Sequence, residues 1–124
     1  MQNVAMLNTT VMKSGFTLVV HRASSPDLSP VSAMFGDAAL IIGAHGGGLY
    51  NHWFASKCTR IIEIFPQGKE YPQIWFQAAL IGQPYYRMYG TSSTGGGFSV
   101  DVNSLTEVVN RILTVPLSQC EMSF

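Results

Sequence analysis

One segment constrains the fold of this chain more than any other, because it predicts a buried strand that enters a helix through a glycine-rich turn. Residues 38–42, Ala-Ala-Leu-Ile-Ile, are apolar without alternation, which is typical of a strand covered on both faces. Residues 43–48 then read Gly-Ala-His-Gly-Gly-Gly, and residues 49–55 are predicted to form a short helix. In α/β folds, ligands bind beyond the carboxyl ends of parallel strands. The segment therefore predicts both a fold class and the position of a ligand site.

Helical and strand patterns alternate along the rest of the chain. Helices are predicted over residues 3–14, 31–35, the part of 67–80 that follows Pro72, and a segment that begins at the capping-box spacing of residues 104–107 and ends before Pro116. Further strands are predicted over 16–20, 60–65 and 84–89, and loops over 21–30 and 92–98. We expect residues 1–116 to form an α/β domain with a Rossmann-like, mostly parallel sheet and helices on both faces, followed by a tail over 117–124. Since the chain opens with a helix, we expect it to be the C-terminal part of something larger.

The charge balance excludes some classes of partner. Lys plus Arg number 7 and Asp plus Glu number 7, so the formal net charge is zero, which argues against nucleic acid or an anionic membrane surface. Charged residues are 11% of the chain, against about a quarter in an average domain, while hydrophobic residues are 47%. We therefore expect part of the surface to lie against another domain or subunit. No apolar stretch approaches the roughly 18 residues of a membrane span, and no signal peptide or metal-ligand cluster is visible. Cys58 and Cys120 allow one disulfide or two unpaired thiols.

Three known motifs compete for the glycine-rich turn. The dinucleotide fingerprint G-x-G-x-x-G fits at Gly46 and Gly48, but Asn51 stands where the third glycine belongs. A phosphate-loop NTPase needs a lysine that is absent here, and an esterase oxyanion hole needs a later G-x-S-x-G and then a histidine, whereas the last histidine is His52. A helix N-terminus with glycines suits a diphosphate, so Gly46, Gly47 and Gly48 are candidate phosphate-binding residues. A tight turn with no ligand is the alternative.

The wider segment resembles the C-terminal region of glycosyltransferase family 61. Residues 43–51, Gly-Ala-His-Gly-Gly-Gly-Leu-Tyr-Asn, are followed by Phe54 and by residues 61–66, Ile-Ile-Glu-Ile-Phe-Pro. The family signature is a His-Gly-Ala-Gly-Leu-Thr-Asn turn and a downstream hydrophobic-Glu-hydrophobic-Phe-Pro strand, and the resemblance extends over most of the chain. Gly47 replaces the common alanine and Tyr50 the common threonine, and residues 29–30, Ser-Pro, stand where the family often has Glu-Gln.

The resemblance implies a GT-B fold, in which two Rossmann-like domains face each other and the C-terminal one holds a nucleotide sugar. It implies inverting transfer from a UDP-sugar, such as UDP-N-acetylglucosamine or UDP-xylose, to a glycan or glycoprotein in the lumen of the Golgi or endoplasmic reticulum. The catalytic base would lie in an N-terminal domain that this chain lacks, so the isolated chain is expected to be inactive. We expect no cofactor, and a donor site without metal that relies on the helix dipole and His45.

Each candidate site residue has a functional and a structural interpretation. His45 is the expected catalytic residue, beside the leaving phosphate, where an imidazole can stabilise developing negative charge; a capping or core histidine is the alternative. The turn from Gly46 through Leu49 would hold the diphosphate. Asn51 would orient the turn or the phosphate, or be an ordinary surface amide.

Glu63 and the residues around it leave further alternatives open. Glu63 is expected to accept hydrogen bonds from ribose hydroxyls, or else to pair with Arg60 or Arg22. Arg22 follows the strand predicted over 16–20, so it would either reach a phosphate or lie solvated in a loop. His52 and Trp53 are expected to serve packing, and Tyr85, Tyr86 and Tyr89 to be strand residues with solvated hydroxyls.

Two other functions remain open beside the transferase. One is a non-catalytic relic that keeps the nucleotide-binding fold, and the other is a dinucleotide-binding domain. Binding of UDP separates the transferase from a relic that has lost its ligand, whereas binding of NAD that UDP does not displace would favour the dinucleotide domain.

Overall fold

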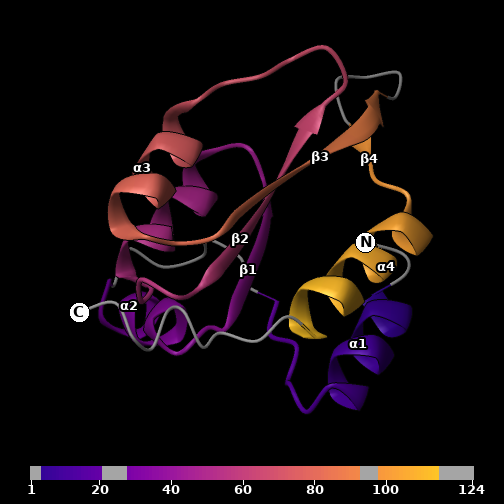
Figure 1. Ribbon diagram of the computed structural model, residues 1–124, viewed down its shortest axis with the longest axis horizontal. Helices are drawn as coiled ribbons and strands as arrows, with labels where there is room; N and C mark the ends of the chain where they lie inside the picture. Colours follow the sequence, from indigo (N-terminus) through magenta and orange to yellow (C-terminus); the bar gives the residue numbers. More distant parts are fainter. Residues whose placement is uncertain (1–3, 21–27, 93–97, 115–124) are drawn as a thin grey trace. The chain divides into compact units, whose positions relative to one another are not determined.

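The computed structural model describes residues 4–20, 28–92 and 98–114 (Figure 1). The chain divides into two compact units. One unit combines Met1–His21 with Ser99–Phe124, and the other spans Arg22–Phe98. The predicted glycine-rich turn and all the candidate site residues lie in the unit Arg22–Phe98.

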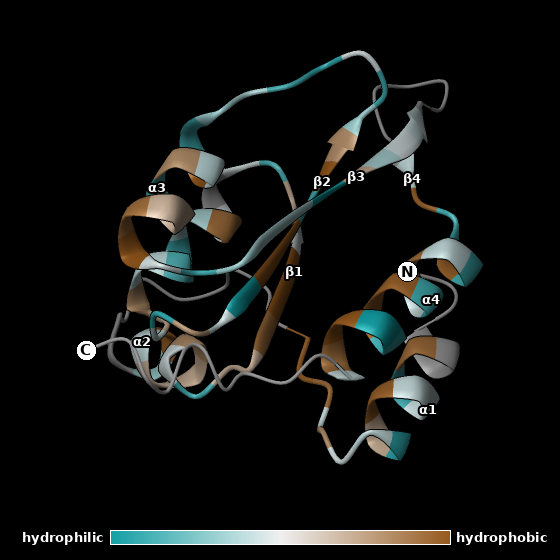
Figure 2. Ribbon diagram, in the orientation of Figure 1, coloured by the Kyte–Doolittle hydropathy of each residue, from teal (hydrophilic) through white to brown (hydrophobic). Residues whose placement is uncertain are grey.

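The sheet has four strands in the order β1-β2-β3-β4, with β1 at Leu40–Ala44, β2 at Arg60–Pro66, β3 at Tyr85–Ser92 and β4 at Phe98–Ser99. Both β1 with β2 and β2 with β3 pair in parallel, which confirms the parallel sheet and the α/β class. The register aligns Gly43 with Glu63 and Glu63 with Arg87. Five consecutive residues of β2, Ile61 to Phe65, are buried, as expected of a central strand, and Figure 2 shows hydrophobic residues along β1 and β2.

Three helical elements belong to the same unit: α2 at Leu28–Gly36, the 3₁₀ helix η1 at Gly47–Phe54, and α3 at Gln73–Ile81. The connections β1–η1–β2 and β2–α3–β3 cross the sheet in the same direction, so right-handed crossovers place η1 and α3 on one face (Figure 1). Both α2 and α3 contact η1. Within this unit the described helices thus lie on one face of the sheet, whereas the sequence predicts helices on both faces of a domain that spans residues 1–116. The core on that face is formed by Phe35, Ile41, Leu49, Ala55, Ile61, Ile74 and Ala78.

Helix boundaries follow local chemistry. The helix α2 begins at Leu28, three residues before the predicted start, and contains Pro30 in its first turn, where proline needs no backbone N–H. The predicted confinement of the third helix by Pro72 is confirmed, since α3 begins at Gln73. Its end is also as predicted, because Gly82 adopts a left-handed conformation with φ 92° and donates its N–H to the carbonyl of Ala78.

The strand predicted over residues 16–20 is wrong. The helix α1, Val4–Lys13, ends as predicted near Gly15, whose φ is 84°, but the following residues form no strand. Val19 and Val20 are 63% and 56% exposed. Apolar, β-branched residues favour a strand only where a neighbouring strand pairs with them, and no such partner is present among the described residues.

The unit formed by Met1–His21 and Ser99–Phe124 contains α1 and α4, Val102–Thr114, which pack against each other. Buried residues on the two helices are Leu7 and Val11, and Leu105, Val109 and Ile112. The predicted capping box is wrong, because Ser104 lies inside α4. The cap is Asp101, whose carboxylate accepts from the N–H of Asn103 at 3.2 Å and from the hydroxyl of Ser104 at 2.7 Å.

No helix in the described ranges is long and apolar enough to cross a membrane.

Candidate functional site

The glycine-rich turn joins the carboxyl end of β1 to η1. Gly46 has φ 154° and ψ −179°, a backbone conformation that is essentially restricted to glycine. Its carbonyl accepts from the N–H of Leu49 at 3.1 Å, and the side chain of Leu49 is buried in the core. The side-chain amide of Asn51 donates to the carbonyl of Gly48 at 3.1 Å. Asn51 therefore stabilises the turn from inside η1, and the N–H of Leu49 is already used.

The position of Gly48, unlike that of Gly46, does not require a glycine. Neither its φ nor its surroundings demand glycine, because a Cβ built on Gly48 meets no described atom within 4 Å. Among the described residues, no hydrogen-bond acceptor faces the N–H group of Gly48, as is usual in a first helical turn. The turn thus presents the open N–H donor of an exposed glycine, Gly48, which remains a candidate for binding an anion.

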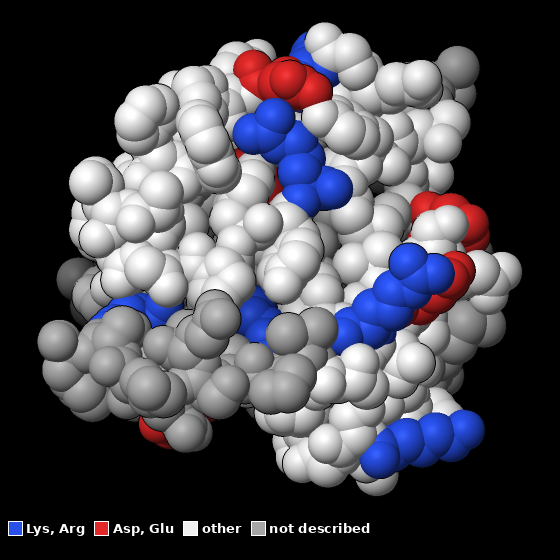
Figure 3. Space-filling model, in the orientation of Figure 1, with Lys and Arg blue, Asp and Glu red and all other residues white. Residues whose placement is uncertain are grey.

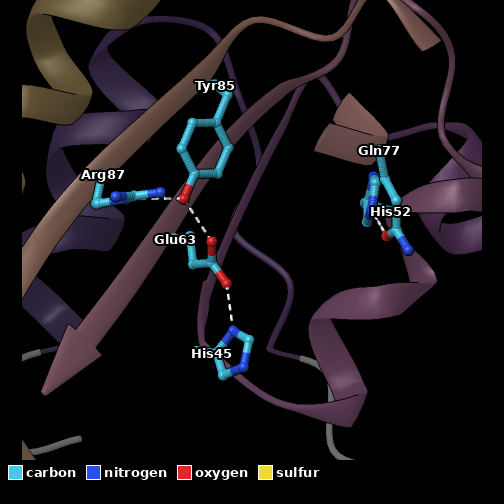
Figure 4. Close-up of polar contacts among 6 residues, drawn as sticks. All are labelled: His45, His52, Glu63, Gln77, Tyr85 and Arg87. Atoms are coloured by element: carbon cyan, nitrogen blue, oxygen red, sulfur yellow. Dashed lines mark hydrogen bonds and ion pairs between the residues drawn. The ribbon is translucent and has the colours of Figure 1, made fainter. Parts of the chain in front are cut away.

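The imidazole of His45 lies immediately before this turn and is held on three sides. Its Nδ1 atom is 2.6 Å from Oε2 of Glu63 (Figure 4). The ring stacks on Phe65 and Tyr71, with centroids 5.1 and 4.8 Å away and interplanar angles of 19° and 20°. The side chain is 21% exposed. Because a carboxylate only accepts hydrogen bonds, Nδ1 carries the proton, and Nε2 makes no hydrogen bond within the described ranges.

Glu63 lies on β2 with no exposed surface, and both of its oxygens have partners. Oε2 faces His45, and Oε1 accepts from the hydroxyl of Tyr85 on β3 (Figure 4). The buried carboxylate is therefore compensated by two donors from the two neighbouring strand ends. In this arrangement its ion-pair partner is His45.

Tyr85 and Arg87 extend the same network along β3. Burial, and secondarily the hydrogen bond to Glu63, raises the pKa of the Tyr85 phenol, which therefore stays protonated and donates. The Nε–H of Arg87 donates to the Tyr85 oxygen at 3.2 Å, and this hydrogen bond is the main reason that the pKa of Arg87 is raised. The guanidinium carbon lies 5.1 Å from the ring centroid of Phe65 and 5.6 Å from that of Tyr85.

The network ends at the loop that follows β2. Nη1 of Arg87 lies 3.5 Å from Oε2 of Glu70, and the hydroxyl of Tyr89 donates to the other oxygen of Glu70. The next residue in this loop is Tyr71, whose ring covers His45. One loop therefore contacts both basic groups of the site, the imidazole through Tyr71 and the guanidinium through Glu70.

Sequence reasoning selected His45 and Glu63 but missed Tyr71, Tyr85 and Arg87. The expectation of a solvated hydroxyl is wrong for Tyr85, because its hydroxyl contacts a buried carboxylate. The available signal was the two-residue spacing of Tyr85 and Arg87, which places both side chains on one face of a strand. Only the strand register shows that this is also the face of Glu63.

His52 forms a separate, buried network, in agreement with its predicted packing role. Its Nδ1 lies 2.8 Å from Oε1 of Gln83, and its Nε2 lies 2.9 Å from the side chain of Gln77 (Figure 4). The Gln83 amide nitrogen donates to the carbonyl of His52 at 2.9 Å and so fixes its own orientation. Trp53 is 51% exposed, and its ring stacks on that of His52 with the centroids 5.8 Å apart.

Some predicted residues cannot be placed. Arg22, with its predicted phosphate contact, and Cys120, with its predicted choice between a disulfide with Cys58 and a free thiol, lie outside the described residues. Within the described ranges, no three His, Cys, Asp or Glu side chains are grouped to hold a metal ion.

The chain matches none of the protein-family models, curated proteins or solved structures with which it was compared.

Proposed function

We propose that the unit Arg22–Phe98 is the nucleotide-sugar-binding part of an inverting glycosyltransferase with a GT-B fold and a UDP-sugar donor. The observation that carries the proposal is the His45–Glu63 pair at the start of the glycine-rich turn. The parallel sheet supports it, since the turn follows the carboxyl end of β1, where ligands of α/β folds bind. The resemblance of residues 43–66 to glycosyltransferase family 61 supplies the reaction class.

In the proposed reaction, the imidazole stabilises the leaving diphosphate. Glu63 holds the proton on Nδ1 and fixes the orientation of the ring, as the carboxylate of a catalytic triad does for its histidine. The protonated Nε2 then donates to the phosphoryl oxygen on which negative charge develops as the glycosidic bond breaks. The N–H groups of Gly47 and Gly48 donate hydrogen bonds to the remaining phosphoryl oxygens.

The geometry changes the part that Glu63 plays in this proposal. A side chain with no exposed surface and two occupied oxygens suits a positioning residue better than a direct ligand of ribose hydroxyls. Glu63 acts on the donor through His45. Asn51 likewise acts through the turn, because its amide is directed at the carbonyl of Gly48.

The proposal places the remaining chemistry outside the described residues. An inverting transfer needs a base that deprotonates the acceptor hydroxyl on the face opposite the diphosphate. A facing domain would supply that base, and the acceptor would be a glycan or glycoprotein in the lumen of the secretory pathway. The 124-residue chain alone then binds a UDP-sugar without transferring it.

Calorimetric titration of the chain with UDP tests the proposal. We expect saturable binding that His45→Gln weakens about tenfold, since a hydrogen bond to a charged group is lost. Lys13→Gln, in the other unit, is the control and should leave the affinity unchanged. Absence of UDP binding, or binding of NAD that excess UDP does not displace, would refute the proposal.

A further inference from the structure

The guanidinium of Arg87 shares an aromatic ring with the imidazole of His45. Its central carbon lies 5.1 Å from the centroid of Phe65, and the imidazole centroid lies 5.1 Å from the same point. The register places Glu63 and Arg87 side by side on β2 and β3, and side chains of paired residues project from the same face of a sheet. Two nitrogen groups able to carry positive charge therefore lie around the ring of Phe65, near the carboxyl ends of β1 and β2.

Arg87 is held in place but is not saturated. Its Nε–H is directed at Tyr85, and its side chain remains 25% exposed. A guanidinium has five N–H donors in a planar fork, which matches the oxygens of a phosphoryl group better than any other side chain. The contacts to Tyr85, to Tyr89 and to the loop after β2 do not use all five donors, so Arg87 can donate to a further acceptor.

The carboxylate that faces Arg87 is a replaceable partner. Glu70 lies 3.5 Å from Nη1, its side chain is 57% exposed, and it also accepts from Tyr89. Exposed ion pairs contribute little to stability, so a ligand with two acidic oxygens can displace such a carboxylate. Figure 3 shows Lys or Arg beside Asp or Glu at several places on this face, so an anion must compete with carboxylates that are already present.

From these contacts we infer that Arg87 and His45 together bind the phosphoryl groups of a diphosphate, with Glu70 occupying the guanidinium when the site is empty. The inference rests on the proposed function, whose donor is a nucleoside diphosphate sugar, and it adds a second anion-binding residue that the sequence motif does not contain. Binding moves Glu70 away from Arg87. Since Glu70 precedes Tyr71, the same exchange changes the cover over His45.

The test measures binding of UDP, inorganic pyrophosphate and uridine to the full chain and to three variants. Arg87→Gln should weaken UDP and pyrophosphate about tenfold or more and leave uridine unchanged, because a charge-assisted contact to phosphate is lost. Arg111→Gln is the matched control, since Arg111 is also exposed and paired with a glutamate, Glu107, at 2.6 Å. Glu70→Gln should strengthen both phosphate ligands by about two- to fivefold, because it removes a competitor. Far-ultraviolet circular dichroism verifies that each variant is folded.

The outcomes separate this inference from the proposed function. Tight UDP binding that Arg87→Gln does not alter, or a Glu70→Gln variant that binds UDP more weakly, would overturn the inference and leave the proposed function standing. If pyrophosphate binding depends on Arg87 but UDP binds no more tightly than pyrophosphate, the result supports the anion site. It contradicts the nucleotide-sugar proposal, because the uridine then adds no affinity. Absence of binding by both phosphate ligands would overturn both.

Discussion

The Nδ1 atom of His45 lies 2.6 Å from Oε2 of Glu63, although 18 residues separate them in the chain. The carboxylate is fully buried, whereas the imidazole keeps part of its edge exposed. A charge in such a position is tolerated only when donors surround it, and here the second donor is the hydroxyl of Tyr85. The pair therefore links the stability of the sheet to the orientation of the candidate catalytic group.

Replacement of Glu63 tests that link. We expect Glu63→Ala to lower the free energy of unfolding by about 3 kcal/mol or more, since it removes a buried acceptor from two donors. Glu63→Gln keeps one acceptor oxygen and should cost less. Urea denaturation measures both. Glu107→Ala is the control, because Glu107 is 64% exposed in its ion pair, and it should cost about 0.5 kcal/mol or less. Equal losses in Glu63→Ala and Glu107→Ala would contradict a structural role for the buried carboxylate.

Substitution by alanine should lower the stability of the chain at one glycine of the turn, Gly46, and leave it unchanged at another, Gly48. Gly46→Ala forces a side chain into a conformation with φ 154° and should destabilise the chain by about 1–3 kcal/mol. Gly48→Ala meets no described atom within 4 Å and should leave the unfolding midpoint in urea nearly unchanged.

The same pair separates stability from binding. In the proposed function a phosphoryl group binds at Gly48, so a Cβ at this position would obstruct the ligand although the fold tolerates it. The affinity for UDP, measured by calorimetry, should therefore fall in Gly48→Ala. An unchanged affinity would mean that no ligand lies close to Gly48.

Tyr85 gives an alkaline dependence of stability with a definite sign. Burial and Glu63 raise the pKa of its phenol above the ordinary value of about 10. As the pH rises past that value, the unfolded chain loses the proton first, so the free energy of unfolding falls. Tyr85→Phe removes this titration and should flatten the decline above about pH 10, where the phenol of the unfolded chain ionises.

Tyr86→Phe is the matched control for this prediction, because Tyr86 is the next residue of β3 and projects from the opposite face. It should keep the decline of the wild-type chain. If Tyr86→Phe and Tyr85→Phe change the alkaline limb of urea-derived stability equally, the contact with Glu63 is not its cause.

The sequence was sufficient to predict those features that depend only on residues within a single helix, strand or turn. Pro72 confines the start of α3, and Gly82 ends it, as the sequence predicts. The apolar run of β2 is buried at every residue from Ile61 to Phe65, and the position of the glycine turn after β1 is likewise as expected. Each of these features depends on backbone conformation or on continuous hydrophobicity, both of which can be read within a few residues.

Features that depend on distant partners were not predictable in this way. Residues 16–20 have strand composition but no pairing strand in the described part of the chain. His45 and Glu63 were each selected, yet their contact requires the register of β1 with β2, and that of Tyr85 requires β3 as well. The site is thus a property of three aligned strands, which no single motif contains.

The helix α4 is capped by Asp101 and not by Ser104, which the capping-box spacing predicts. This cap makes the stability of the chain depend on pH in the acid range. Hydrogen bonds from Ser104 and then from the N–H of Asn103 lower the pKa of Asp101, so its stabilising charge is present above the unfolded value of 3.8 and lost as the pH falls through the folded value. Asp101→Ala should lower the melting temperature at neutral pH, because α4 loses its cap. Asp101→Asn keeps a capping acceptor without a titrating charge, so its melting temperature should fall less than that of the wild type on acidification.

Ser104→Ala should lose part of the acid dependence and keep the cap. Thermal unfolding at about pH 7 and about pH 3 measures all three, and an Asp101→Ala variant that melts with the wild type at neutral pH would show that α4 begins without help from Asp101.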